Sequence, residues 1–139
     1  MKSLLIAAAL LTGFVFVPAS FADVVKYKAD LTASASVPPI DSKGTGTADV
    51  TYDTATKMLN WKVSYKKLSG AVTAAHFHGP ASVTENAAPV VDVSKMVKKG
   101  MATLTDAQAA DLAAGKWYLN LHTKKFPAGE IRGQVVAAK

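Results

Sequence analysis

The chain has 139 residues and no cysteine, and its 16 lysine and arginine residues outnumber its 10 aspartate and glutamate residues, for a formal charge of +6 at pH 7. The absence of cysteine excludes a disulfide framework, a thiolate metal site and a cysteine nucleophile, so any site must use nitrogen and oxygen atoms. The positive charge favours small anions and anionic surfaces as partners.

The beginning of the chain has the pattern of a secretory signal peptide over residues 1–22. Lys2 precedes an apolar run over residues 4–17, and Ser20 and Ala22 place small side chains where a signal peptidase reads them. We predict cleavage after Ala22, a periplasmic or secreted location, and one domain over residues 23–139. The apolar run is too short to span a membrane, and export separates the protein from nucleic acid, so neither is expected as a partner.

The first half of the domain has the alternation of apolar and polar residues that strands show. Residues 24–31 form a predicted strand, and residues 37–40 an irregular extended segment, because its two prolines cannot donate ladder hydrogen bonds. The strand pattern resumes over residues 47–52. The clearest strand spans residues 58–66, where one face should be buried and the other should contact water.

The second half contains five more predicted strands and one helix. Thr105 and Gln108 form a capping box before the helix, and Gly115 stands where its C-terminal cap is expected. Proline and glycine in residues 126–129 predict a type I turn between the last two strands. The strands cover residues 71–78, 89–93, 101–104, 117–123 and 130–136, and the helix covers residues 106–114. About seven or eight short strands with one short connecting helix predict an all-β fold, an antiparallel Greek-key β-sandwich.

The 3 histidines of the chain lie in two of these strands, which makes them the candidate metal ligands. His76 and His78 are one residue apart, so a strand points both to the same face, and His122 lies in the strand over residues 117–123. Three imidazoles with an open fourth position suit a metal ion. The alternative is structural: His76 hydrogen-bonds a loop carbonyl, His78 contacts solvent, and His122 caps the turn at residues 126–129.

Copper is the predicted ion, with zinc as the alternative. No acidic residue adjoins the histidines in sequence, so the ligands are all nitrogen, and copper stands highest in the affinity order of divalent metals. Hairpin pairing brings the last strand beside His122, where Glu130, Arg132 or Gln134, depending on register, could orient an imidazole. The alternative for the charged residues is a cross-strand ion pair. Tyr118 shares the face of His122 and is a further candidate to support the metal ligands.

An ordered set of phrases between Val37 and Gln134 resembles the CHRD domain, a family named after chordin and widespread in exported bacterial proteins. The phrases are Leu68-Ser69-Gly70, residues 72–81, Pro89-Val90-Val91, residues 119–123 and residues 126–134. The resemblance implies an extracellular β-rich module and supplies no mechanism. The family often carries an acidic residue before Val-Pro-Pro, whereas this chain has Ser36, so no role of that carboxylate transfers. The histidine pattern is also similar to that of copper-zinc superoxide dismutases, which use more histidines.

Two classes of function follow from these features. The first is an exported protein that binds copper through His76, His78 and His122, for sequestration or for small-molecule redox chemistry. Its enzymatic version is a copper-dependent, superoxide dismutase-like oxidoreductase, and a protein that only binds the ion is preferred. The second class is a metal-free extracellular or periplasmic module for adhesion or protein interaction. No serine-histidine-acid order, paired-carboxylate motif or phosphate loop points to a hydrolase.

Overall fold

The computed structural model describes residue 17 and residues 21–139, so most of the predicted signal peptide lies outside the described residues. The strands are β1 (Val24–Thr32), β2 (Thr45–Asp53), β3 (Met58–Lys66), β4 (Val72–His78), β5 (Pro89–Asp92), β6 (Lys99–Thr103), β7 (Trp117–Thr123) and β8 (Ile131–Ala137), with one helix, α1 (Asp106–Ala113). Within the described residues they form one eight-stranded sheet in the order β5-β4-β7-β8-β1-β2-β3-β6. Every pairing is antiparallel. The predicted all-β antiparallel class with a short helix is confirmed.

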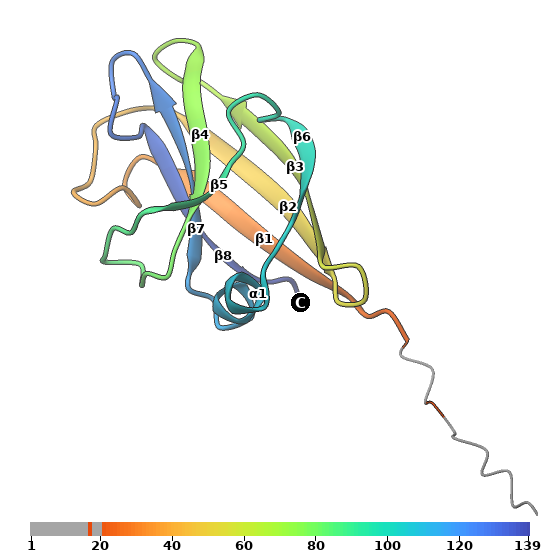
Figure 1. Ribbon diagram of the computed structural model, residues 1–139. Coiled ribbons are helices and arrows are strands. Elements are labelled where there is room, and N and C mark those ends of the chain that lie inside the picture. Colours follow the sequence, from red (N-terminus) through yellow and green to blue (C-terminus); the bar gives the residue numbers. More distant parts are fainter. Residues whose placement is uncertain (1–16, 18–20) are drawn as a thin grey trace, which may run out of the picture.

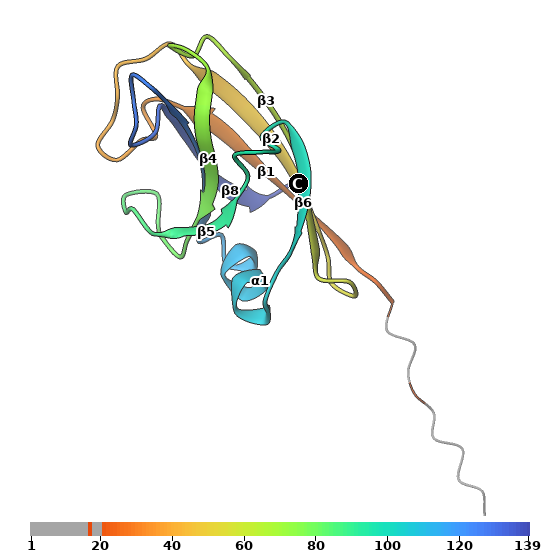
Figure 2. The same cartoon turned by 45° about the horizontal axis from the view of Figure 1, so that its top comes forward.

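The sheet curls so that its two halves face each other across a shared core, as Figures 1 and 2 show. Trp61 on β3 meets Phe77 on β4 edge to face, with ring centroids 5.9 Å apart, although the two strands are not neighbours in the sheet. The sandwich is therefore a single sheet folded over on itself. Its edges are the short strands β5 and β6, which lie on either side of the opening in Figure 2.

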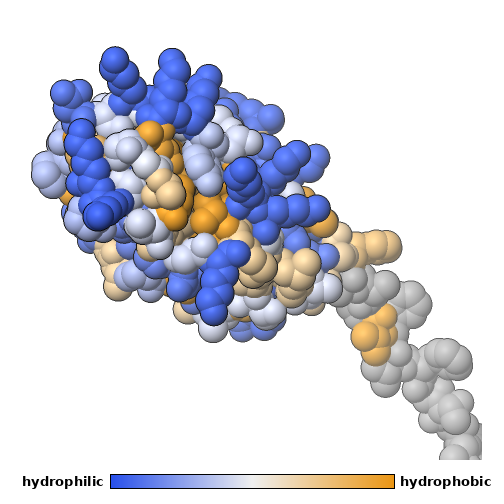
Figure 3. Space-filling view, turned by 90° about the horizontal axis from the view of Figure 1, so that it is seen from above, coloured by the Kyte–Doolittle hydropathy of each residue, from blue (hydrophilic) through white to orange (hydrophobic). Residues whose placement is uncertain are grey.

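The core is built from the apolar positions that alternate along the strands. On β3, Leu59, Trp61 and Val63 are each at most 3% exposed. Trp117 on β7 is fully buried and packs against Phe77 with ring centroids 5.8 Å apart, so both tryptophans anchor the core. Seen from above in Figure 3, the surface is mainly hydrophilic with a narrow apolar strip. Burial of these side chains is the main source of stability in a domain without disulfides.

The helix α1 lies across one end of the folded sheet, between β6 and β7 (Figure 1). Its capping box is present: the Gln108 amide donates to Thr105 Oγ1 at 3.2 Å, and the Thr105 amide donates to Gln108 Oε1 at 2.9 Å. Gly115 follows the helix with φ +70°, a conformation that favours glycine. Leu112 is its buried residue. In the described part of the chain, no helix is long and apolar enough to cross a membrane.

The strand β7 differs from β3 because all seven of its residues are buried. Its alternating residues form a core face and an opposite, more polar face, and loops cover the polar face. These loops follow β1, β4 and β7, and Figure 1 shows them gathered beside β4, β7 and β8. Asn86 donates to the Val37 carbonyl at 2.8 Å and joins two of them. The outer face of β4, β7 and β8 is therefore an enclosed polar layer.

Candidate metal centre

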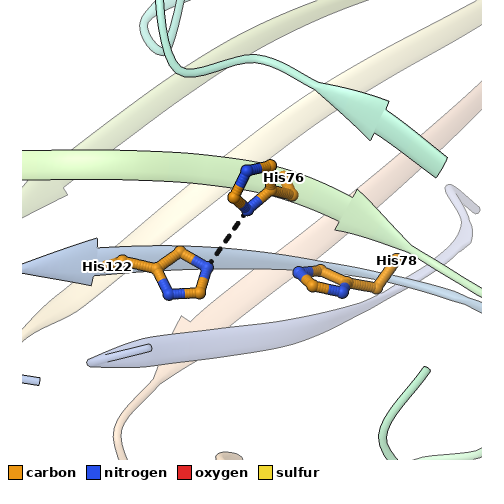
Figure 4. A group of neighbouring side chains, drawn as sticks. All are labelled: His76, His78 and His122. Carbon is orange, nitrogen blue, oxygen red and sulfur yellow. Dashed lines mark hydrogen bonds between the residues drawn. The ribbon is translucent and has the colours of Figure 1, made fainter. Parts of the chain in front are cut away.

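The three histidines meet on this enclosed face. The β4–β7 register places His122 opposite Ala74 and His76 opposite Asn120, so His76 and His122 are diagonal neighbours on one face. The ring centroid of His76 lies 5.5 Å from that of His78 and 5.1 Å from that of His122. One ring nitrogen from each histidine lies within 4.8 Å of the other two, and Figure 4 shows the rings turned toward a common space.

Loop carbonyls hold two of the rings in orientation. His78 Nδ1 lies 2.9 Å from the Ala87 carbonyl oxygen, and His122 Nδ1 lies 2.9 Å from the Pro127 carbonyl oxygen. Because a carbonyl only accepts, each Nδ1 carries the proton and each Nε2 keeps a lone pair that can accept a hydrogen bond or bind a metal ion. His122 Nε2 lies 3.3 Å from His76 Nδ1. A histidine that binds a metal ion through one ring nitrogen usually donates a hydrogen bond from the other, as His78 and His122 do to these carbonyls.

The His78 Nε2 atom is buried and has no hydrogen-bond partner among the described residues. A buried polar atom without a partner costs free energy, so an unpaired imidazole lone pair beside two other imidazoles points to a missing partner. Since metal–nitrogen bonds are about 2.0 to 2.1 Å long, two nitrogens on one ion lie at most about 4.2 Å apart. Separations within 4.8 Å need only a slight closure. The residues present fit a metal ion.

The structural alternative for the histidines is met only in part. His122 does bond a carbonyl of the turn at residues 126–129, as that alternative stated. For the other two the roles are reversed, because His78 bonds the loop carbonyl while His76 has a side chain 21% exposed. These carbonyl bonds use Nδ1 of His78 and His122, so they do not compete with metal binding through Nε2. A bound ion would replace the hydrogen bond between His122 Nε2 and His76 Nδ1.

Burial lowers the pKa of both His78 and His122, and it outweighs the carbonyl bonds, which act in the opposite direction. Nearby His76 lowers both pKa values further. The two imidazoles therefore stay neutral, which is the form that binds a metal, to a lower pH than free histidine.

Acidification should destabilise the metal-free protein through these two groups. The unfolded chain takes up protons at the ordinary histidine pKa of 6.5, whereas the folded chain resists them. This contribution to stability is thus fully present above that pH and is lost as the pH falls through the lowered pKa values of the folded state. Urea unfolding across this range should give a falling free energy of unfolding. The His78→Gln/His122→Gln variant should lose most of this slope, and an unchanged slope would contradict the assignment.

An acidic residue missed in the sequence lies next to the cluster. The β4–β5 register places Asp92 opposite His76, and its Oδ1 atom lies 3.8 Å from His76 Nε2. This is the ring nitrogen away from His122, so Asp92 borders the cluster from outside and the inward-facing atoms remain nitrogen. Asp92 lies within the predicted strand at residues 89–93. The pairing of this strand with β4, which brings Asp92 opposite His76, was not predictable from the local sequence pattern.

Tyr118 and Arg132, both predicted to support the ligands, form a stack behind His78. The Tyr118 ring lies parallel to the His78 ring, with centroids 4.7 Å apart and a 2° interplanar angle. The Arg132 guanidinium carbon lies 3.6 Å from the Tyr118 ring centroid on a cation–π contact. The Tyr118 hydroxyl accepts from the Ala87 amide at 3.1 Å, so this tyrosine also steadies the loop whose carbonyl orients His78.

Removing the Tyr118 ring should weaken metal binding without removing a ligand. Groups that orient a metal ligand typically contribute roughly 10-fold to 100-fold in affinity, so we expect a loss of about tenfold in Tyr118→Leu and a smaller loss in Tyr118→Phe, which keeps the stack. Competition titration with a chromophoric chelator measures both. Tyr65→Leu, on distant β3, is the matched control. Equal affinities in Tyr118→Leu and the control would remove Tyr118 from the site.

Glu130 serves a different purpose from the one predicted. It is fully buried, and its carboxylate accepts from the Ser42 hydroxyl at 2.6 Å, the Ser69 amide at 2.8 Å, the Ser69 hydroxyl at 2.7 Å and the Thr123 hydroxyl at 2.7 Å. Burial alone would raise its pKa, but these hydrogen bonds lower it. Among the described residues, no hydrogen bond joins Glu130 to an imidazole and no ion pair joins it to Arg132. Glu130 thus links the loops that contain Ser42 and Ser69 to the end of β7.

Comparison with known proteins bears on the family alone. The CHRD domain family matches residues 27–135, which spans nearly the whole described domain. No curated protein and no solved structure matches the chain. The match includes all three histidines and the loops that orient them. It assigns no ligand to them.

Proposed function

The chain belongs to the CHRD domain family. We propose that it is an exported protein that binds a metal ion, copper(II) in preference to zinc, through His76, His78 and His122. The observation that supports the proposal most is the buried His78 Nε2 atom, which has no partner among the described residues. It faces two other imidazoles within 4.8 Å, and its ring is oriented by a carbonyl bond and a stacked tyrosine.

The preference for copper follows from the donor set. The inward-facing atoms are three imidazole nitrogens, and copper(II) binds such sites more tightly than the other divalent first-row metals. A bound copper ion would supply one-electron redox chemistry. The protein's own contribution is to keep His78 and His122 neutral through burial, to fix their tautomers with loop carbonyls, and to hold the cluster beneath the loops.

We assign the protein to binding and sequestration of the ion in the periplasm or outside the cell. The apolar run and the small residues Ser20 and Ala22 support export with cleavage after Ala22, and the domain then begins at Asp23. Turnover of a small oxidant by the copper-loaded protein is the enzymatic extension of this role. A protein without turnover but with tight binding is a store or a carrier.

Calorimetric titration of copper(II) and zinc(II) into protein beginning at Asp23 tests the proposal. We expect one ion per chain, tighter binding of copper, and loss of both in the His76→Ala/His78→Ala/His122→Ala variant. This variant keeps the amino terminus and every carboxylate, so binding outside the histidine cluster persists in it and can be subtracted. Equal binding in the two proteins would overturn the proposal and favour a metal-free interaction module.

A further inference from the structure

A cavity lies beside the histidine cluster, under the loops that cover β7 and β8. Its volume is about 330 Å³, which is at the lower end for small-molecule sites. His78 contributes to its wall, whereas His76 and His122 do not. Ser36 and Asn120 also line it, and each carries a buried polar atom with no partner among the described residues. The cavity is therefore a separate compartment with unpartnered polar atoms in its wall, and it shares one wall with the metal centre.

The Asn120 side chain presents an acceptor to this cavity. Its Nδ2 donates to the Ala128 carbonyl at 3.3 Å, which fixes the amide orientation and leaves Oδ1 as the unpaired atom. Asn120 is only 8% exposed, so bulk water does not compensate for the missing bond. Gly129, with φ +119°, packs directly against the amide, and a Cβ atom there would collide with it. The backbone at Ala128 and Gly129 thus fixes Asn120 Oδ1, an acceptor without a hydrogen-bond donor, in the cavity wall.

Arg132 brings a positive charge that lacks a counter-ion. It is 2% exposed, and its hydrogen bonds go to neutral oxygens: Asn86 Oδ1 at 2.9 Å, the Ser82 carbonyl at 3.1 Å and the Glu85 carbonyl at 2.7 Å. In the part of the chain that the structure describes, no carboxylate lies within ion-pair distance of it. A buried charge without an opposite charge is costly, so an anion in the cavity would lower the free energy. The guanidinium also keeps unused donors for such an anion.

The remaining wall is apolar and is formed by Val37, Pro38, Ile40 and Ala128. We propose that the cavity binds a small organic carboxylate that also bears a hydroxyl group. The carboxylate compensates the charge of Arg132, the hydroxyl donates to Asn120 Oδ1, the Ser36 hydroxyl completes the polar contacts, and a short hydrocarbon part lies against the apolar wall. Binding requires no metal ion, so this proposal stands apart from the proposed function.

Three matched compounds test the proposal on the metal-free protein: lactate, propionate, which lacks the hydroxyl, and lactamide, which lacks the charge. Nitrogen-15 NMR follows the Asn120 side-chain amide and the Arg132 Nε–H resonance during titration. We expect lactate to bind more tightly than lactamide by roughly tenfold or more, since hydrogen bonds to charged groups are the stronger ones, and more tightly than propionate by a smaller factor.

Variants of the cavity complete the test. Ser36→Val and Asn120→Leu should weaken lactate binding, and Ala128→Trp, at an exposed position that tolerates a larger side chain, should block the cavity and abolish it. Ser34→Val makes the same change at an exposed serine two residues away and should leave binding unaltered. Equal affinity for lactate and lactamide would overturn the proposal. So would lactate binding to Ala128→Trp as well as to the wild type.

Discussion

Replacing Glu130 with alanine is expected to lower the free energy of unfolding by about 3 kcal/mol or more, because it breaks a buried charged network. The carboxylate accepts four hydrogen bonds, from Ser42, twice from Ser69, and from Thr123. Without it, the fully buried Thr123 hydroxyl loses its charged acceptor, while the half-buried Ser42 and the exposed Ser69 exchange theirs for water. Glu130→Gln should be intermediate, since its amide keeps one acceptor oxygen.

Urea unfolding measures both variants, and an unchanged slope with denaturant identifies the effect as stability. Glu85→Gln, the same change at an exposed carboxylate, is the control and should stay within about 0.5 kcal/mol of the wild type. Copper affinity of folded Glu130→Gln should equal that of the wild type. A stable Glu130→Gln protein with weakened copper binding would instead restore the role predicted from the sequence, in which Glu130 orients an imidazole.

Metal binding should raise the stability of the folded protein by a comparable amount. An ion that binds only the folded state, at a free concentration about 1,000 times its Kd, stabilises by about 4 kcal/mol. Thermal unfolding with and without copper(II) measures the shift. The variant lacking all three histidines should show none, and Asp92→Asn should keep nearly all of it, because Asp92 borders the cluster from outside. A shift of equal size in the triple-histidine variant would place the ion elsewhere.

The fold class could be predicted because period-2 alternation is a local property of the sequence. Residues 58–66 and 117–123 were predicted with the bounds that β3 and β7 have in the structure, and the capping box placed the start of α1. The other bounds differ by one or two residues at their ends, where hydrogen bonding rather than pattern decides. That the sandwich is one curled sheet follows from long-range pairings such as β1 with β8, which no local pattern encodes.

The candidate ligands could be predicted because His76 and His78 share a strand face and His122 lies on a strand that pairs beside them. Their surroundings could not. The carbonyls of Ala87 and Pro127 come from loops whose paths depend on tertiary contacts, and Asp92 reaches His76 only through the β4–β5 register. The hairpin of β7 and β8 was predicted correctly, and it suggested that Glu130 lies beside an imidazole. In the structure, its carboxylate oxygens instead accept hydrogen bonds from the hydroxyl groups of Ser42, Ser69 and Thr123.

The most direct test of the histidine site is the electron paramagnetic resonance spectrum of the protein loaded with one equivalent of copper(II). Coupling of the unpaired electron to ligand nitrogens reports how many imidazoles bind the ion. The account predicts coupling to the three imidazole nitrogens of His76, His78 and His122, with one fewer in His122→Ala. A spectrum that is the same in the wild type and in the variant lacking all three histidines would contradict it.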